Sequence, residues 1–337
     1  MARLSAVSEL TLADSDAVKL LLRGDSVIDW HRLNYADHAE VDRFLRLNEF
    51  DPENDEEMAR LEDVRSDAVE YLSRAFAMAI PDEVAGDLPA RDLFLVASSH
   101  GPHQKWACVV LKVMHIIHHI NGRAGLLKMS VSDEIIFREV ELKVMQVVEQ
   151  LRAAGAPLTE WEWSRKPRDS QITKLLAKRS TLAANIYDKL RFRLIVPTPD
   201  DLVPMIGTLT RQLIPFNYII PGESLNQLVD LQQLLPDRLD AGPAPAEPYN
   251  EFSGPEYRII NFVADLPLRI ERLVPRTEVP QNTAHVVFVL TEFQIADKAT
   301  ALRNESGASS HEAYKARQNE RVRMRLFREK DDPLPPD

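Results

Sequence analysis

Near the C-terminal end of the chain, an acidic residue lies in a position that suits chemistry on a metal-bound polyphosphate. Glu292 and Gln294 fall in an apolar stretch, residues 285–295, that predicts a β-strand. Alternation along a strand places these two on one face, with Phe293 and Ile295 on the other. A carboxylate at the end of a central strand is costly unless it is ligated or hydrogen-bonded. We therefore expect Glu292 to have a functional partner.

A predicted helix follows this strand and carries a second set of reactive side chains. His311 and Lys315 are four residues apart, so they share one helical face, with Tyr314 beside them. The same spacing occurs on ordinary exposed helices. The His311, Tyr314 and Lys315 side chains therefore indicate a functional site only in combination with Glu292.

A basic cluster lies upstream. Lys166, Ser170 and Lys174 follow one another at four-residue steps, which predicts one face of a helix, with Arg165 alongside and Pro167 in the first turn. Two ammonium groups, a hydroxyl and a helix N-terminus would together bind a polyphosphate. A solvated basic helix face would give the same pattern, and spacing alone does not separate the two.

The next predicted strand, residues 186–197, begins with a carboxylate. Asp188 could ligate Mg²⁺ while Arg193 neutralises phosphate oxygens. The two residues have opposite strand parity, so they can share a site only if Asp188 lies at the irregular start of the strand. The alternative is an edge strand protected by its charges.

Together these residues resemble the synthetase domain of the RelA/SpoT family, the pyrophosphokinases that make (p)ppGpp. The family has a basic helix with Lys, Ser and Lys at four-residue steps, and an Asp followed five residues later by Arg. It also has a Glu-x-Gln-Ile strand end and a helix with Glu-x-Gly, His and Tyr-Lys. The similarity covers roughly residues 156–325, with these matching residues: Lys166, Ser170, Lys174, Asp188, Arg193, Glu292, Gln294, Ile295, Glu305, Gly307, His311, Tyr314 and Lys315.

The resemblance implies a transferase that moves pyrophosphate from ATP to the 3′-hydroxyl of a nucleotide. It implies Mg²⁺ held by Asp188 and Glu292, with Glu292 also a candidate base. It further implies a nucleotide pocket made by Lys166, Ser170, Lys174, Arg193, Arg165, Gln294, His311, Lys315 and Tyr218. The alternative on the same fold is a catalytically silent protein that binds nucleotides in a regulatory role.

The acceptor loop departs from the family. The family loop opens Asp-Tyr-Ile and ends Gly-Tyr-x-Ser-Leu-His, and its second Tyr stacks on guanine. Here Tyr218 keeps part of the opening, but Gly222 replaces the stacking Tyr and Asn226 replaces the His. Phe216, Tyr218 or Tyr249 could supply another stacking surface. The identity of the acceptor is therefore left open. No His-Asp dipeptide occurs, so the family's hydrolase domain is not recognisable.

Three histidines on one predicted helix raise the question of a metal site. The spacing of His115, His118 and His119 suits two ligands on one face. The helix is strongly apolar, however, and no nearby cysteine or acidic cluster completes a site. We favour a core or interface role. Apolar neighbours also predict that the single cysteine, Cys108, is buried.

The composition sets limits on the class of protein. At 337 residues and a net charge of −11, the chain lacks the cationic surface of a bulk nucleic-acid binder, although tRNA stays open as an acceptor. No stretch has the roughly 20 apolar residues that span a bilayer, and the N-terminus does not resemble a signal peptide. We expect a cytoplasmic protein with nucleotide partners and no membrane contact, and a homo-oligomer stays open.

The periodicity predicts a helical first half followed by a half with both helices and strands, and the resemblance implies an α+β fold with a mixed β-sheet, nucleotidyltransferase-like synthetase domain. Residues 1–155 are expected to form a helical domain of unknown role, 156–330 the synthetase domain and 331–337 a disordered tail. Predicted helices include 14–22, 55–77, 106–120, one from 130–133 to about 155, 200–213 and 296–330. Predicted strands are 186–197, 257–266 and 285–295. Residues 92–96 fit either a strand or a helix.

Overall fold

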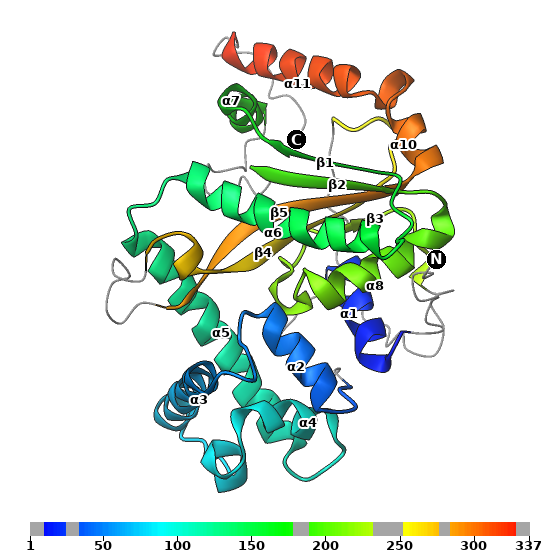
Figure 1. Cartoon of the computed structure of the whole chain (residues 1–337). Helices are drawn as coiled ribbons and strands as arrows, with labels where there is room; N and C mark the ends of the chain where they lie inside the picture. Colours follow the sequence, from blue (N-terminus) through cyan, green and yellow to red (C-terminus); the bar gives the residue numbers. More distant parts are fainter. Residues whose placement is uncertain (1–9, 25–33, 178–188, 232–251, 276–283, 328–337) are drawn as a thin grey trace.

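The protein has an α+β fold built on one five-stranded sheet (Figure 1). The computed structural model describes residues 10–24, 34–177, 189–231, 252–275 and 284–327. Asp188, most of the loop at 240–255 and the tail 331–337 lie outside these ranges. The predicted fold class, a mixed sheet preceded by a helical region, is confirmed.

The sheet has the strand order β1-β2-β5-β4-β3. The strands are β1 (Glu160–Arg165), β2 (Leu190–Val196), β3 (Leu225–Asn226), β4 (Ile260–Arg269) and β5 (Val286–Asp297). β2 and β5 are parallel, and the other neighbours are antiparallel. The three predicted strands are present, whereas β1 was not predicted. Glu292 lies within β5 and not at its end, because the strand continues to Asp297.

One face of the sheet, here called the apolar face, is packed with phenylalanine rings. Phe293 stacks on Phe192 and on Phe262 at ring-centroid distances of 5.6 and 5.4 Å, and all three are fully buried. This face shares a continuous core with three helices, α1 (Leu12–Arg23), α6 (Asp133–Ala153) and α8 (Leu202–Gln212). The predicted start of α6 is confirmed, since the Ser132 side chain caps it.

A second hydrophobic core lies in the helical region at the bottom of Figure 1. It is formed mainly by α2 (His38–Leu47), α3 (Asp55–Phe76), α4 (Leu93–Ser98) and α5 (Gln104–Lys128), so residues 92–96 are helical. Cys108 is buried here as predicted, and burial raises the pKa of its thiol. Within the described ranges, no helix combines the length and apolar character needed to cross a bilayer.

Helix α5 joins this helical region to the sheet. A side chain at Gly122 would overlap the Phe288 ring at 2.5 Å and the Val286 carbonyl at 2.8 Å, so only glycine lets α5 approach β5 this closely. The boundary predicted at residue 155 stays a prediction. Helices α1 and α6, which precede it, belong to the core of the sheet.

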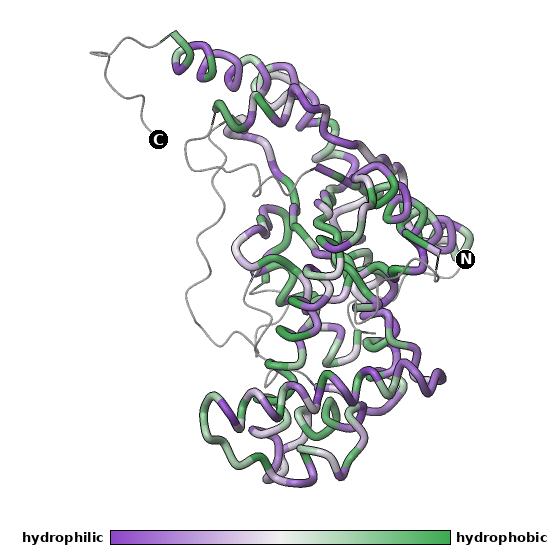
Figure 2. Tube along the Cα trace, turned by 90° about the vertical axis from the view of Figure 1, so that its left-hand side faces the viewer, coloured by the Kyte–Doolittle hydropathy of each residue, from purple (hydrophilic) through white to green (hydrophobic). Residues whose placement is uncertain are grey.

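The remaining helices are α7 (Arg168–Ala177), α10 (Lys298–Asn304) and α11 (His311–Leu326). α7 packs on α11, with Ala177 and Val322 in one small cluster. The helix predicted over 296–330 is interrupted at 305–310, where Ser310 caps the start of α11. Figure 2 shows hydrophilic residues recurring along α11, the helix at the top of both views. Lys166 lies before α7 and not on it. The prediction that Lys166 shares one helical face with Ser170 and Lys174 is therefore wrong.

Candidate functional site

The face of the sheet opposite the phenylalanines, here called the polar face, gathers charged and amide side chains. Strand pairing places Arg191 opposite Glu292 and Arg193 opposite Gln294 on the two parallel strands. On β4, Asn261 is also opposite Gln294. Residues opposite one another in a ladder point to the same face, so one surface carries all five.

Glu292 forms an ion pair with Arg191 at the centre of this face. The Arg191 Nε donates to Glu292 Oε2, and Glu292 is only 7% exposed. A buried carboxylate needs such a partner because desolvation penalises its charge. In the structure, the partner of Glu292 is thus a cation of the adjacent strand.

Arg193 lies between two acidic side chains. Its Nη1 is 3.4 Å from Glu162 Oε1 on β1 and 3.5 Å from Glu305 Oε1 after α10. Its Nε is buried without a hydrogen-bond partner among the described residues. Arg193 also lines a cavity of about 350 Å³ between β1, the end of α6 and α10, and Lys298 and Arg152 contribute further cations to it.

The start of α11 and the segment before β4 adjoin the polar face. The pKa of Tyr257 is raised by burial, a shift opposed by nearby Arg193 and Arg191 and reinforced by Glu292 and Tyr314. The pKa of His311 is lowered by burial and by Lys315 and Arg191. Tyr257 and His311 thus lie within electrostatic range of charged side chains of the polar face.

Tyr257 is held in place by the segment that carries it. The backbone of Arg258 makes two hydrogen bonds to the Asn304 side chain, of 3.1 and 2.7 Å. Gly254 packs so closely on residues 308–309 that a Cβ would lie 2.6 Å from the Ala308 oxygen. Tyr257 was not among the predicted site residues. The signal was its position four residues before Asn261, the Tyr-to-His spacing of the family loop, at the start of β4.

Of the predicted basic cluster, Ser170 and Lys174 lie on α7 and are half-buried. Lys166 is tied to the start of β2, since its backbone N–H donates to the Lys189 oxygen at 2.8 Å. α7 is connected to the site through α11, on which it packs and which begins with His311. Lys315 is exposed one turn further along α11.

Two predicted site residues are separated from this group. Arg165 pairs with Leu190 in the sheet, so it points to the other face, where it donates two hydrogen bonds of 2.6 and 2.8 Å to Glu141 on α6. Tyr218 is 3% exposed, with its ring 4.4 Å from Phe288 and 4.8 Å from His115. Protein rings therefore occupy the surroundings of Tyr218, which corrects its expected role in stacking on a base.

The segment around Gly222 and Asn226, which the sequence predicted to be a changed acceptor loop, has a structural role. Gly222 has a left-handed φ of 78°, and its N–H donates to the Gly24 oxygen beside α1. The Asn226 side chain closes a turn, donating to the Val229 carbonyl at 2.9 Å and accepting from the Val229 N–H at 3.1 Å. β3 is one of the two edge strands of the sheet, so these residues lie away from the central β2–β5 pair.

The histidines of α5 have the core and interface role favoured from sequence. His119 Nε2 is 2.8 Å from Asp265 Oδ2 on the polar face, and Arg123 Nε is 3.3 Å from the same oxygen. Burial lowers the pKa of His115 to about 3 and that of His118 to about 4, with their histidine neighbours contributing. In the described part of the chain, no group of three or more acidic, histidine or cysteine side chains is arranged to hold a metal.

No family model and no curated protein matches the sequence. Among solved structures, the small alarmone synthetase 1 from Bacillus subtilis matches with a TM-score of 0.31 and 15% identity, over 57% of this chain and 85% of that one. The small alarmone synthetase 2 from the same organism gives 0.32 and 14%, over 58% and 91%. A GTP pyrophosphokinase family protein from Streptococcus pneumoniae gives 0.30 and 16%, over 57% and 82%. The fold class rests on the sheet described above.

Proposed function

We propose that the chain is a pyrophosphokinase that transfers pyrophosphate from ATP to the 3′-hydroxyl of a nucleotide acceptor. The observation that carries the proposal is the polar face, where residues from three separate motifs converge. Glu292, Gln294 and Arg193 share the face, and His311 of α11 adjoins it. Motifs with the family's spacing would not be expected to meet at one surface by chance.

In this reaction the acceptor oxygen forms a bond to the β-phosphorus of ATP and the bond to the oxygen of the AMP leaving group breaks. Arg191 and Arg193 would balance the negative charge of the phosphates, as cations do in phosphoryl transfer. Glu292 would take the proton of the 3′-hydroxyl, and Tyr257 would offer a ring for stacking on the acceptor base. Lys174 and Lys315 would extend the cationic surface.

The described residues of the polar face could hold Mg²⁺ through a single carboxylate. Glu292 supplies one hard carboxylate ligand, and Mg²⁺ is commonly held by one or two carboxylates together with substrate phosphates. Asp188, outside the described residues, would be the second carboxylate. Bound there, the ion would neutralise charge on the phosphate oxygens.

The second candidate is a nucleotide-binding protein without turnover. It is favoured by the ion pair to Arg191, which engages the carboxylate that turnover needs, and by the two acids beside Arg193. In that case the same surface would bind nucleotides and transfer nothing.

Incubation of the full chain with Mg²⁺, γ-labelled ATP and GDP, GTP or tRNA in parallel tests the proposal. We expect AMP and a labelled acceptor product from one of the acceptors. The Glu292→Gln variant should lose turnover by about 10²- to 10³-fold while retaining ATP binding. Glu312→Gln, on the exposed first turn of α11, is the matched control and should behave like wild type.

The results separate the two candidates. ATP binding by calorimetry without AMP release for any acceptor would favour the silent protein. Equal AMP release by wild type and Glu292→Gln would contradict the assigned role of Glu292.

A further inference from the structure

Helix α5 brings a cation to the polar face at Asp265, a residue with no role in the reaction proposed above. The Asp265 carboxylate is fully buried on β4, and its Oδ2 is 2.8 Å from His119 Nε2 and 3.3 Å from Arg123 Nε. Its other oxygen, Oδ1, is buried without a hydrogen-bond partner among the described residues. A buried carboxylate is costly unless opposite charge compensates it. Asp265 therefore depends on Arg123, and it fixes the position of the guanidinium in return.

The Arg123 side chain is held at one end and open at the other. Nε is its closest nitrogen to Asp265, and the side chain is 43% exposed. Within the described residues its two Nη groups make no hydrogen bond. A guanidinium carries five N–H donors in a planar fork that matches two oxygens of a phosphate. Arg123 thus presents oriented donors to an anion on the polar face.

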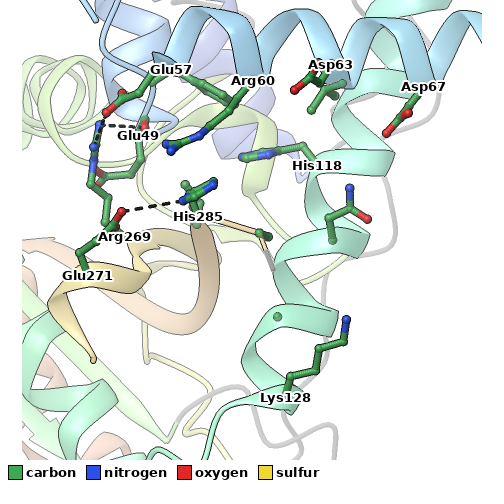
Figure 3. A pocket seen from close by; sticks show the side chains of 16 residues that line it. Glu49, Glu57, Arg60, Asp63, Asp67, His118, Lys128, Arg269, Glu271 and His285 are labelled. Carbon is green, nitrogen blue, oxygen red and sulfur yellow. Dashed lines mark hydrogen bonds and ion pairs between the residues drawn. The ribbon is translucent and has the colours of Figure 1, made fainter. Parts of the chain in front are cut away.

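The part of α5 that carries Arg123 is fixed against the sheet. Gly122 lies so close to β5 that a Cβ would overlap the Phe288 ring at 2.5 Å. The His119 ring meets the same Phe288 ring edge-on at 4.7 Å. On the neighbouring side of the helix, His118 points into a cavity of about 320 Å³ between α3 and α5 (Figure 3). Arg123 is therefore carried by a rigid element, as a binding residue should be.

The side chains along β4 follow an order that matches the parts of a nucleotide. Tyr257, assigned above to stacking on the acceptor base, precedes the strand. Val263 is opposite Glu292, the residue assigned to the 3′-hydroxyl, and Asp265 is two residues further along the same face. From the spacing of strands and residues, the Cα atoms of Glu292 and Asp265 are about 8 Å apart. The 5′-phosphates of a ribonucleotide lie beyond the ribose on the side away from the base, which here is the side of Asp265.

We propose that Arg123 binds the 5′-phosphates of the acceptor and that Asp265 positions its guanidinium. The inference rests on the proposed function, since it takes Glu292 to face the 3′-hydroxyl. Arg123 selects nucleotides with a 5′-phosphate over nucleosides, because a nucleoside offers nothing to its Nη donors. The helical region therefore takes part in the choice of acceptor through α5.

Calorimetry on the full chain tests the role of Arg123. The donor site is first filled with α,β-methylene-ATP and Mg²⁺, and the titrants are ribonucleoside triphosphates and the matching nucleosides. Arg123→Gln should weaken binding of the preferred triphosphate at least about 10-fold, the effect of losing a charged hydrogen bond, and leave nucleoside binding unchanged. The matched control is Lys105→Gln, which removes a charge from an exposed position of the same helix and should change neither.

Two further variants test the positioning by Asp265. Asp265→Asn should weaken triphosphate binding at least about 3-fold in the wild type but not in Arg123→Gln, because Asp265 acts through Arg123. Arg123→Lys keeps a cation beside the buried carboxylate and so protects the fold. It should still weaken triphosphate binding, since one ammonium lacks the fork that joins Asp265 and a phosphate. The free energy of unfolding, measured alongside, reports any structural loss separately.

Equal losses for triphosphate and nucleoside in Arg123→Gln would overturn the assignment. Unchanged triphosphate binding in this variant, or no triphosphate binding by the wild type, would overturn it as well. The readout is binding without turnover, so the two proposals can fail separately. AMP release together with an unaffected Arg123→Gln variant would remove this inference alone. Phosphate-dependent binding through Arg123 without AMP release would remove the pyrophosphokinase activity alone.

Discussion

The two faces of the sheet are held together by different physical forces. On the apolar face, Phe192, Phe262 and Phe293 stack and are fully buried under helices. Arg191 and Glu292, which directly precede Phe192 and Phe293 in the sequence, form an ion pair on the polar face. Burial of large apolar side chains stabilises a fold strongly, whereas partly exposed ion pairs contribute little. The same strands thus supply stability on one side and chemical groups on the other.

The largest expected effect is on the apolar face. Phe293→Ala should lower the free energy of unfolding by about 3–5 kcal/mol, because it removes a ring packed between two others. Gln294→Ala, the next residue on the polar face, should cost at most about 1 kcal/mol. Denaturation in guanidinium chloride measures both. Similar losses would show that the polar face also carries the fold.

A smaller effect is expected where α5 meets the polar face. The buried Asp265 carboxylate accepts contacts from His119 and Arg123. A double-mutant cycle of His119→Ala and Asp265→Ala should give a coupling energy of about 1–2 kcal/mol at pH 7, measured by urea denaturation. Additive effects of the two changes would contradict a direct interaction.

The pH dependence of stability gives a further test. The pKa of His118 is about 4 in the folded protein, below the usual value near 6.5 in the unfolded chain. As the pH falls from about 6.5 to 4, the unfolded state binds a proton that the folded state does not. The free energy of unfolding should therefore decrease by about 1.4 kcal/mol per pH unit through this histidine.

His118→Asn should make this dependence shallower by about that slope, and unfolding curves recorded across the range would show it. His100→Asn is the control, since His100 is exposed. An unchanged slope in His118→Asn would mean that the ring is protonated in the folded protein. His115, with a pKa of about 3, contributes to the pH dependence of stability equally in the wild type and in His118→Asn.

The smallest effect is expected at the acids beside Arg193. Glu305→Gln would remove one of the two carboxylates that compete with phosphate for this guanidinium. ATP affinity should rise by up to about 5-fold, as expected for loss of an exposed pair worth at most about 1 kcal/mol. Calorimetric titration at low and high salt, with Glu312→Gln alongside, measures this. A lower affinity would mean that Glu305 contacts the nucleotide or its metal.

The contrast between the faces also explains which features were predictable. Strands β2, β4 and β5 were predicted because their apolar residues are continuous or alternate, a pattern imposed by burial. β1 was missed although Trp161 and Trp163 alternate with glutamates, because it is a mostly exposed edge strand. These strands could therefore be predicted from the local hydrophobic pattern and residue spacing.

The polar face was predictable only in part. Glu292, Gln294 and Arg193 were placed together by motif spacing. The Arg191 pair and Tyr257 were not found, because they depend on strand register and on a contact between distant segments. Arg165 and Tyr218 were assigned to the site because sequence order does not show which face a residue joins.

The parallel pairing of β2 and β5 has a consequence for how the site forms. Arg191 and Glu292 are 101 residues apart in the chain, and no short hairpin can bring parallel neighbours together. Contacts of such separation form only after a large loss of chain entropy, and they slow folding. The central ion pair should therefore be among the last contacts made. No fragment that ends before β5 could contain this ion pair, because Glu292 lies on that strand.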